Sequence, residues 1–271
     1  MVYQSNVAMS DHSNRRDASK AQKPLLSRLL CVKMTLRDVL YITYAIPVGK
    51  LRSLVPEILP VATIGDDIAF VSVVVLRSTQ VRLSSMPFLQ FEYQQLNVRT
   101  YVKDPSTGKH AVYFLRSGVT SRFISFVTRI SGIPWHLIDL ETEINTKNKT
   151  DSYVASGNWE GRFSLGAKSF IEESKQTPFF ENRESAVDFL IRPLVGFVGD
   201  NQRLGRFTIQ HPEVDPQSYT LTGLDFPLFT SLGAVDESSN PHSVFFLPMA
   251  DFTIYLPPRR ISIKGGERLC G

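Results

Sequence analysis

The chain has 271 residues, of which 42% are hydrophobic and 21% are charged. This balance is typical of globular proteins and unlike that of disordered ones. The formal net charge of +4 is too small an excess to indicate a protein that binds nucleic acids. The longest strongly apolar stretch, Ile68–Leu76, is far shorter than the roughly 20 residues of a membrane-spanning helix. No hydrophobic leader follows a basic start, so we expect a cytoplasmic protein.

The two ends of the chain differ from its middle. Residues 1–24 are mostly polar, and we expect them to form a mobile tail. No repeat or linker interrupts residues 25–260. We interpret this stretch as one domain, because β-barrels and β-sandwiches of about 200–250 residues often form a single unit. Residues 261–271 would then be a C-terminal tail.

Strands dominate the predicted elements. Apolar runs and alternating patterns predict strands at Arg37–Ile46, Ile68–Leu76, Phe91–Lys103, His110–Arg116, Trp135–Ile144, Ser152–Trp159, Arg162–Ser169, Arg206–His211 and Ser243–Tyr255. Apolar residues at helical spacing predict short helices after Pro47, from Ser121 to Ile130 and over Glu184–Arg192. We therefore predict an α+β fold, with a β-barrel or a strongly curved sheet at its centre and a few short helices.

The most informative strand is Phe91–Lys103. Alternate residues of a strand face opposite sides, so one face carries Leu96, Val98 and Val102. The other face carries what we call the polar row: Tyr93, Gln95, Asn97, Arg99 and Tyr101. A face open to solvent is one explanation of this row. Two tyrosines and an arginine are more typical of a partly desolvated pocket, in which a guanidinium holds a carboxylate and amides orient a carbonyl.

The same strand resembles a known family. The stretch Gln95–Val102 is similar to the signature E-L-N-V-R-T-Y-V of the YqjF-like family of unknown function, which is placed in the acetoacetate decarboxylase-like superfamily. Further elements of that family are similar to Ile46–Pro56, Ala111–Phe114, Gln210–Pro212 and Ser243–Tyr255, so the resemblance covers residues 35–257. It implies a curved, largely antiparallel β-barrel that encloses a cavity.

The resemblance breaks at the catalytic residues of the decarboxylases. Those enzymes form a Schiff base between a lysine and a keto acid, and the lysine follows a Gly-x-Pro element. The nearest counterpart here is Gly132–Pro134, which Trp135 and His136 follow, and neither side chain can form an imine. Gln95 also replaces the glutamate of the signature with an amide, which cannot exchange a proton near neutral pH. We therefore do not expect Schiff-base decarboxylation.

Other side chains extend the candidate site. His136 and His211 are the candidate catalytic bases, because imidazole titrates near neutral pH; a structural or surface role is the alternative for each. Tyr113, Arg116 and Trp135 are candidate ligand contacts, as a neighbour on the pairing strand, a second cation and a stacking surface. The spacing of histidines and cysteines predicts no metal site, and no nucleotide-binding glycine loop is present, so we expect no cofactor.

Two functions therefore stay open. The first is binding of a small organic acid or carbonyl compound, or lyase-like chemistry on it without a lysine Schiff base. The second is a structural or interaction protein, in which the polar row is an internal hydrogen-bond network. We expect neither a nucleic acid nor a membrane as partner, whereas self-association is not decided by the sequence.

Overall fold

The computed structural model describes residues 31–148, 150–170, 178–236 and 239–261. The tail expected at residues 1–24 lies outside these residues. So does the tail expected at 261–271, except for Ile261, which ends a strand.

The described strands belong to one twelve-stranded sheet. They are β1 (Cys31–Pro47), β2 (Ile68–Leu83), β3 (Met86–Lys103), β4 (His110–Val119), β5 (Trp135–Leu137), β6 (Asp139–Asn148), β7 (Thr150–Asn158), β8 (Arg162–Ser169), β9 (Val195–Gly199), β10 (Leu204–Gln210), β11 (Gln217–Asp225) and β12 (Ser243–Ile261). Between them lie the short helices α2 (Gly49–Arg52), α3 (Arg122–Ile130), α4 (Arg183–Leu190) and α5 (Pro227–Leu232). None of these helices is long and apolar enough to span a membrane.

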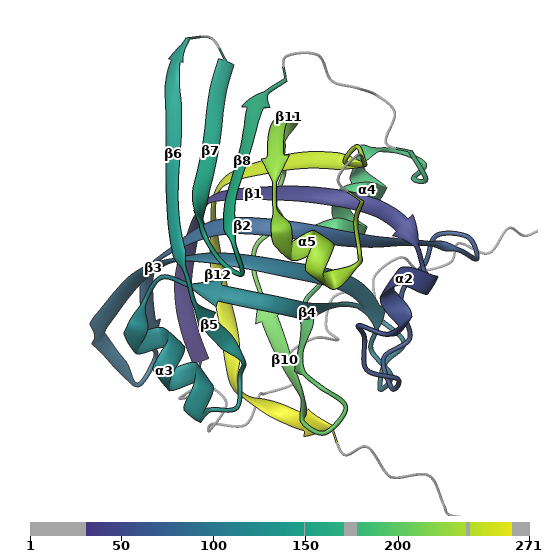
Figure 1. Cartoon of the computed structure of the whole chain (residues 1–271). Coiled ribbons are helices and arrows are strands. Elements are labelled where there is room, and N and C mark those ends of the chain that lie inside the picture. Colours follow the sequence, from purple (N-terminus) through teal and green to yellow (C-terminus); the bar gives the residue numbers. More distant parts are fainter. Residues whose placement is uncertain (1–30, 149, 171–177, 237–238, 262–271) are drawn as a thin grey trace, which may run out of the picture.

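The sheet curls until its first strand, β1, meets β12. Strand β1 pairs with β2 on one side and with β12 on the other, so β1, β2, β3, β4, β9, β10 and β12 close into a ring (Figure 1). Strands β11, β8, β7 and β6 continue from β12 as an outer sheet, which lies in front of β1 and β2 in Figure 1. Neighbours pair antiparallel except for β4 with β5 and β4 with β9. The predicted α+β class with a curved, largely antiparallel sheet is confirmed.

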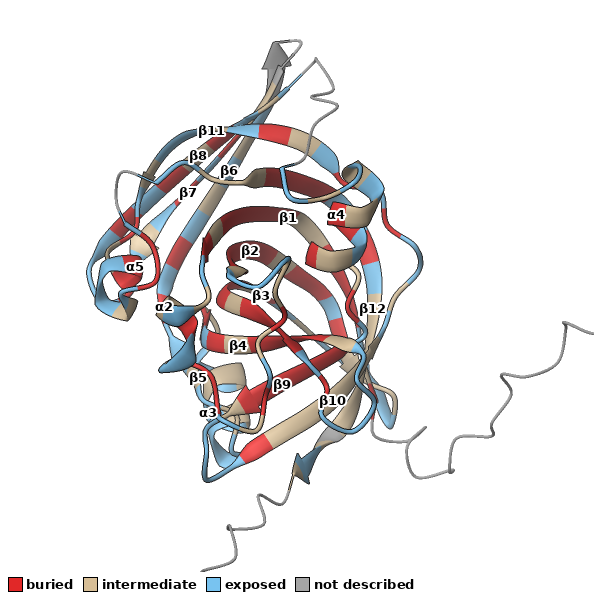
Figure 2. Cartoon of the chain, turned by 90° about the vertical axis from the view of Figure 1, so that its right-hand side faces the viewer, coloured by how far each residue is buried: buried red, intermediate tan, exposed pale blue. Residues whose placement is uncertain are grey.

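The strands β1 to β3 separate two hydrophobic cores. The outer core lies between these strands and the outer sheet, and it joins Val73 and Val98 to Tyr153 and Phe163. The inner core fills the ring and contains Tyr41, Val74 and Tyr101 together with Ala186, Val187 and Leu190 of α4. Runs of consecutive buried residues therefore lie along the middle of these strands (Figure 2). The continuous apolar run of β2 follows from this position, because both of its faces are covered.

Two bulges bend the strands that form the ring. The register shifts between Arg37 and Leu40 of β1, and between Ser78 and Val81 of β2. Asp38 and Gln80 lie within these shifts and have positive φ angles of 56° and 51°. An extra residue bends a strand and increases its twist, which lets long strands curve enough to close.

Candidate functional site

The polar row lies inside the ring. The pairing of β3 with β2 is unshifted from Thr100 to Tyr93, so every second side chain of this stretch points to the same face. Tyr93, Gln95, Asn97 and Tyr101 are at most 7% exposed, and Arg99 is half-buried. A face open to bulk solvent is therefore not the explanation of the row.

At one end of the row, two side chains converge on the C-terminal end of α4. Arg99 Nη2 donates a hydrogen bond to the carbonyl oxygen of Leu190 at 2.6 Å, and the Tyr101 hydroxyl donates to the same oxygen at 2.9 Å. The last carbonyls of a helix carry partial negative charge, which suits a guanidinium. The Arg99 guanidinium carbon also lies 5.2 Å from the ring centroid of Tyr41 and 5.7 Å from that of Tyr101, within the range of cation–π attraction.

Among the described residues, the charge of Arg99 lacks a carboxylate partner and one of its hydrogen-bond donors lacks any partner. It forms no ion pair with a carboxylate in the described part of the chain, and its Nε is buried without a hydrogen-bond partner. A buried N–H without a partner costs free energy. The guanidinium is therefore held by one carbonyl and two rings, and its Nε donor is left without a partner among the described residues.

His110 belongs to this end of the site although the sequence did not single it out. Its ring stacks on Tyr101 with centroids 5.7 Å apart and lies 4.0 Å from the ring of Phe189. Burial, with Arg99 and Lys103 nearby, lowers the pKa of His110 to about 4, so its ring is neutral at pH 7. Its Nε2 is buried without a partner. His110 pairs with Lys103 across the hairpin between β3 and β4. Extending the polar row along the predicted hairpin to this pair could have identified His110 as a neighbour of the row.

The other end of the row is formed by amides and aromatic rings. Gln95 Nε2 donates to Asn97 Oδ1 at 2.8 Å, and the Trp135 ring lies 6.5 Å from that of Tyr93. Burial raises the pKa of Tyr93 to about 12, which keeps this phenol protonated. Ser117 lies opposite both Asn97 and Trp135, and its hydroxyl is buried without a hydrogen-bond partner.

Tyr113 and Arg116 do not join the polar row. Tyr113 pairs with Thr100, packs in the outer core and donates a hydrogen bond to the carbonyl of Gly199 at 2.7 Å. Leu115 is an extra residue in β4, because Arg99 pairs with Phe114 whereas Val98 pairs with Arg116. This bulge turns Arg116 outward to an exposed position and aims the next residue, Ser117, into the ring.

The two candidate bases also lie apart from the row. His136 is exposed, and its ring is 6.2 Å from that of Trp159 in the outer core. His211 follows β10, stacks on Phe252 at 4.8 Å, and its Nδ1 lies 2.7 Å from the Pro212 carbonyl. Neither ring contacts a member of the row within the described residues. In the same part of the chain, no three His, Cys, Asp or Glu side chains come together as metal ligands would.

Two hollows lie outside the ring interior. One of about 750 Å³ lies beside α5, between β11 and β1. The other, of about 470 Å³, lies among Arg37, Arg77, Gln80 and Glu92 where the bulges of β1 and β2 meet the end of β3. The polar row lines neither of them.

The ring with its outer sheet is the fold of acetoacetate decarboxylase-like enzymes. The chain is similar to such an enzyme from Sphingomonas wittichii RW1, with a TM-score of 0.58, 11% identity and coverage of 86% of this chain and 94% of that chain. It is also similar to the enduracididine biosynthesis enzyme MppR complexed with pyruvate, with a TM-score of 0.56, 13% identity and coverage of 86% of this chain and 90% of that chain. For acetoacetate decarboxylase from Legionella pneumophila, the TM-score is 0.53 and the identity 10%, with coverage of 85% of this chain and 87% of that chain. At these identities the similarity shows the fold alone.

The family follows from the sequence match. The model of the family DUF2071, described as "Uncharacterized conserved protein", matches residues 33–251. The chain therefore belongs to this family, and its fold is the acetoacetate decarboxylase-like fold that the resemblance implied. No curated protein matches the chain.

Proposed function

We propose that the protein binds a small carboxylate- or carbonyl-bearing molecule inside the ring and does so without a lysine Schiff base. The observation that carries this proposal is the state of Arg99. Its guanidinium faces the ring interior with no carboxylate partner among the described residues and with Nε buried and unpaired. An anionic ligand would satisfy both its charge and its free donor.

Two further unpaired polar atoms support the proposal. Ser117 Oγ and His110 Nε2 are buried without partners, and both residues lie on the strand that pairs with the row. Buried polar groups in native proteins nearly always have partners, so a ligand that bonded these two atoms would gain from satisfying them. A ligand near Asn97 would meet a hydroxyl and an amide, and one near Arg99 would meet a neutral imidazole.

The residues suggest a role for each part of such a ligand. Arg99 would hold a carboxylate, Asn97 and Gln95 would orient a carbonyl, and Tyr93, Tyr101 and Trp135 would form the walls. His110 is the histidine beside the row, and its pKa of about 4 suits a hydrogen-bond acceptor at neutral pH. The structure of MppR complexed with pyruvate is a precedent in this fold for a ligand of the proposed class.

The absence of imine chemistry is part of the proposal. No lysine side chain that the structure describes is buried, whereas a Schiff-base lysine needs a desolvated position to be neutral at pH 7. Trp135, at the counterpart of the lysine position, packs toward the inner core, and His136 points away from it. Lys103 is the nearest lysine in the sequence to the row, but it is exposed.

The binding proposal is tested by thermal unfolding with pyruvate and acetoacetate as probes. Ligand at about 100 times its Kd should stabilise the protein by about 2.7 kcal/mol. Arg99→Gln should abolish this stabilisation. Arg116→Gln is the matched control, because it removes an arginine from the opposite, exposed face of the neighbouring strand. If Arg99→Gln responds to these acids as the wild type does, Arg99 is not the anchor.

A structural network is the second candidate, and the hydrogen bonds to Leu190 favour it. Arg99 and Tyr101 together fix the C-terminal end of α4 to the ring. If this is their whole role, Arg99→Gln should lower the free energy of unfolding by about 1–3 kcal/mol, and no small acid should stabilise the wild type.

Borohydride reduction tests the mechanism separately from binding. Incubation with acetoacetate or pyruvate and borohydride should leave the mass of the intact protein unchanged, since no lysine whose burial the structure describes is buried. A stoichiometric adduct that peptide mapping assigns to one lysine, Lys103 above all, would contradict this part of the proposal and leave the anion-binding part intact.

A further inference from the structure

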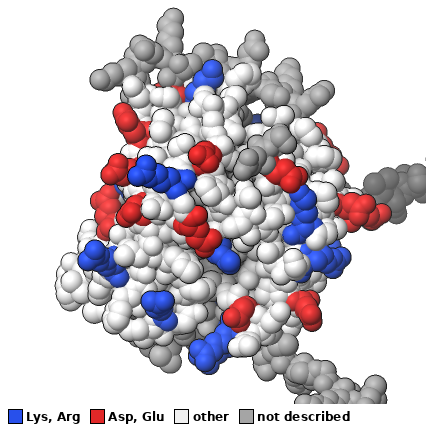
Figure 3. Space-filling model, viewed as in Figure 1, with Lys and Arg blue, Asp and Glu red and all other residues white. Residues whose placement is uncertain are grey.

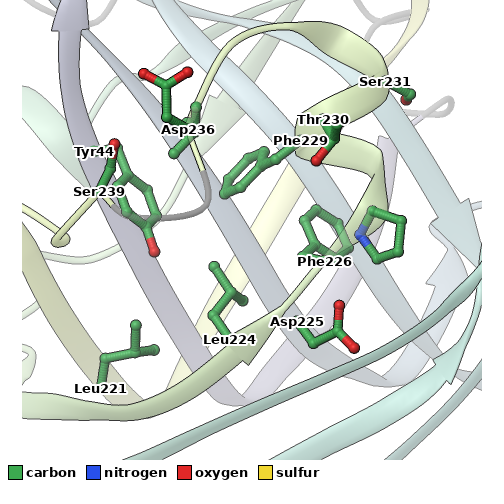
Figure 4. Close-up of a pocket in the computed structure, with 12 residues that line it drawn as sticks. Tyr44, Leu221, Leu224, Asp225, Phe226, Phe229, Thr230, Ser231, Asp236 and Ser239 are labelled. Atoms are coloured by element: carbon green, nitrogen blue, oxygen red, sulfur yellow. The ribbon is translucent and has the colours of Figure 1, made fainter.

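The hollow beside α5 is built from apolar walls with a polar rim. Leu221 and Leu224 of β11 form one wall, and Phe226 and Phe229 form another (Figure 4). The Phe226 and Phe229 rings pack edge to face at 5.1 Å, and Phe229 packs in the same way on Tyr44 at 5.4 Å. These contacts hold the walls in place, and a volume of about 750 Å³ suits a small organic ligand.

Tyr44 provides an unpaired polar group on the inner side of this hollow. The residue is only 2% exposed, and its hydroxyl points toward the middle of the hollow (Figure 4). It forms no hydrogen bond with any described residue, unlike the buried Tyr101, which has two. Burial raises the pKa of Tyr44 to about 12, so the phenol stays protonated and its oxygen can accept a hydrogen bond.

The rim of the hollow is acidic. Asp225 and Asp236 both line it, and Glu160 lies next to it, where its carboxylate accepts a hydrogen bond from Ser231 at 3.3 Å. Lys50 neutralises Asp236 at 2.8 Å, but Asp225 has no ion-pair partner in the described ranges. On the face of the molecule that carries α5, acidic and basic side chains are interspersed (Figure 3). The carboxylates at the rim of the hollow are therefore not part of a wider acidic surface.

We propose that this hollow is a second ligand site, which takes a small organic cation with an apolar body, such as an arylalkyl amine. The ammonium group would lie near Asp225, with the Tyr44 oxygen as a hydrogen-bond acceptor. The apolar body would pack on Leu221, Leu224 and Phe229. Aromatic faces and carboxylates together favour cations over neutral molecules of the same shape.

The second site is independent of the ring interior. Tyr44 and Phe229 belong to the outer core, whereas the polar row belongs to the inner core on the opposite face of the same strands. The two sites would also select ligands of opposite charge. A variant of Arg99 should therefore leave amine binding unchanged, so the failure of one proposal does not decide the other.

Calorimetric titration of the full chain with 2-phenylethylammonium tests the proposal. The uncharged 2-phenylethanol and the anionic phenylacetate are the matched probes. We expect saturable binding of the amine, and binding at least about tenfold weaker for the two other probes. Asp225→Asn and Tyr44→Phe should each weaken amine binding by about three- to tenfold. Glu143→Gln, which removes an exposed carboxylate from β6, should leave the affinity unchanged, as should Arg99→Gln.

The outcome is decided by the charge preference and by Asp225. This exposed aspartate can be replaced without disturbing the core, so its variant stays informative if Tyr44→Phe fails to fold. Absence of saturable amine binding would overturn the proposal. So would equal affinity for 2-phenylethanol, or an Asp225→Asn protein that binds the amine as the wild type does.

Discussion

Asp104 links the hairpin between β3 and β4 to β10, which lies beyond β9 in the sheet. Its carboxylate is fully buried and accepts hydrogen bonds from Ser106, Thr107 and Arg206. The Arg206 guanidinium contributes two of these bonds, both to Oδ2, at 2.8 and 3.0 Å. Although burial alone would raise the pKa of Asp104, these hydrogen bonds outweigh it and lower the pKa to about 2.

Replacing this carboxylate should be costly. Asp104→Ala leaves the Arg206 cation without its carboxylate and the loop without its acceptor, so the free energy of unfolding should fall by about 3–5 kcal/mol. Urea unfolding measures this change. Lys109→Ala, in the same loop but exposed, is the control and should stay within about 0.5 kcal/mol of the wild type. A loss below about 1 kcal/mol for Asp104→Ala would show that Arg206 finds other partners.

His110 makes stability depend on pH in mildly acid solution. Its pKa falls from 6.5 to about 4, first because of burial and then because of Arg99 and Lys103. Between these values the unfolded chain takes up a proton that the folded protein does not. The stability contributed by the neutral ring is therefore present above pH 6.5 and is lost as the pH falls toward 4.

A His110→Asn variant should remove this dependence. Its melting temperature should fall less than that of the wild type between pH 6.5 and 4, because the side chain no longer titrates. His242, whose pKa is also lowered by burial, is present in both proteins, so the difference between the two pH profiles isolates His110. Parallel profiles would mean that His110 is accessible to protons in the folded state.

Among the elements, α3 exposes the apolar face that helices usually bury. None of its residues is buried, and the exposed fractions of Phe123, Phe126 and Ile130 are 53%, 63% and 72%. We expect Phe126→Ser to change the free energy of unfolding by no more than about 0.5 kcal/mol. Leu190→Ala in α4 should lower it by about 2–5 kcal/mol, because Leu190 is 1% exposed and packs in the inner core. Urea unfolding of both variants measures the contrast, and a large loss for Phe126→Ser would show that its ring is covered.

The sequence predicted regular elements better than irregular ones. The helical spacing of Phe123, Phe126 and Ile130 predicted α3, but spacing alone does not tell which side of a helix meets the core. Strand β11 has no regular alternation of buried and exposed residues, and β9 has only five residues, so neither was predicted. Helix α5, which spans six residues, was not predicted either.

In the candidate site, the alternation of side chains along β3 predicted the polar row. Which residues lie next to the row depends on the register in which β3 pairs with β4, which the sequence did not predict. The row follows from an unshifted stretch of β3, in which period two holds residue by residue. The bulge at Leu115 reverses the faces of β4 beyond it, so Arg116 points out and Ser117 points in. No local sequence pattern predicts the bulge at Leu115. His110 became visible as part of the site only through its ring contacts with Tyr101 and Phe189.

At the scale of the whole molecule, β2 is the layer that both cores share. From Ala69 to Leu76 each of its residues is at most 6% exposed, so neither face of the strand meets solvent. Val73 points into the outer core, opposite Val98, and Val74 points into the ring, opposite Asn97 of the polar row. Substitutions at these two adjacent residues therefore affect two separate parts of the molecule, the outer core and the ring interior.

This arrangement gives a prediction for a pair of neighbouring substitutions. Val73→Ala and Val74→Ala should each lower the free energy of unfolding by about 2 kcal/mol, because each leaves a cavity in a packed core; urea unfolding measures both. Only Val74→Ala should change the Kd of a small acid, since its cavity opens beside Asn97, whereas the Val73 cavity opens toward the outer sheet. A strand that buried only one face would tolerate one of the two changes. Equal effects of both variants on the Kd would mean that the acid binds outside the ring, whatever their effects on stability.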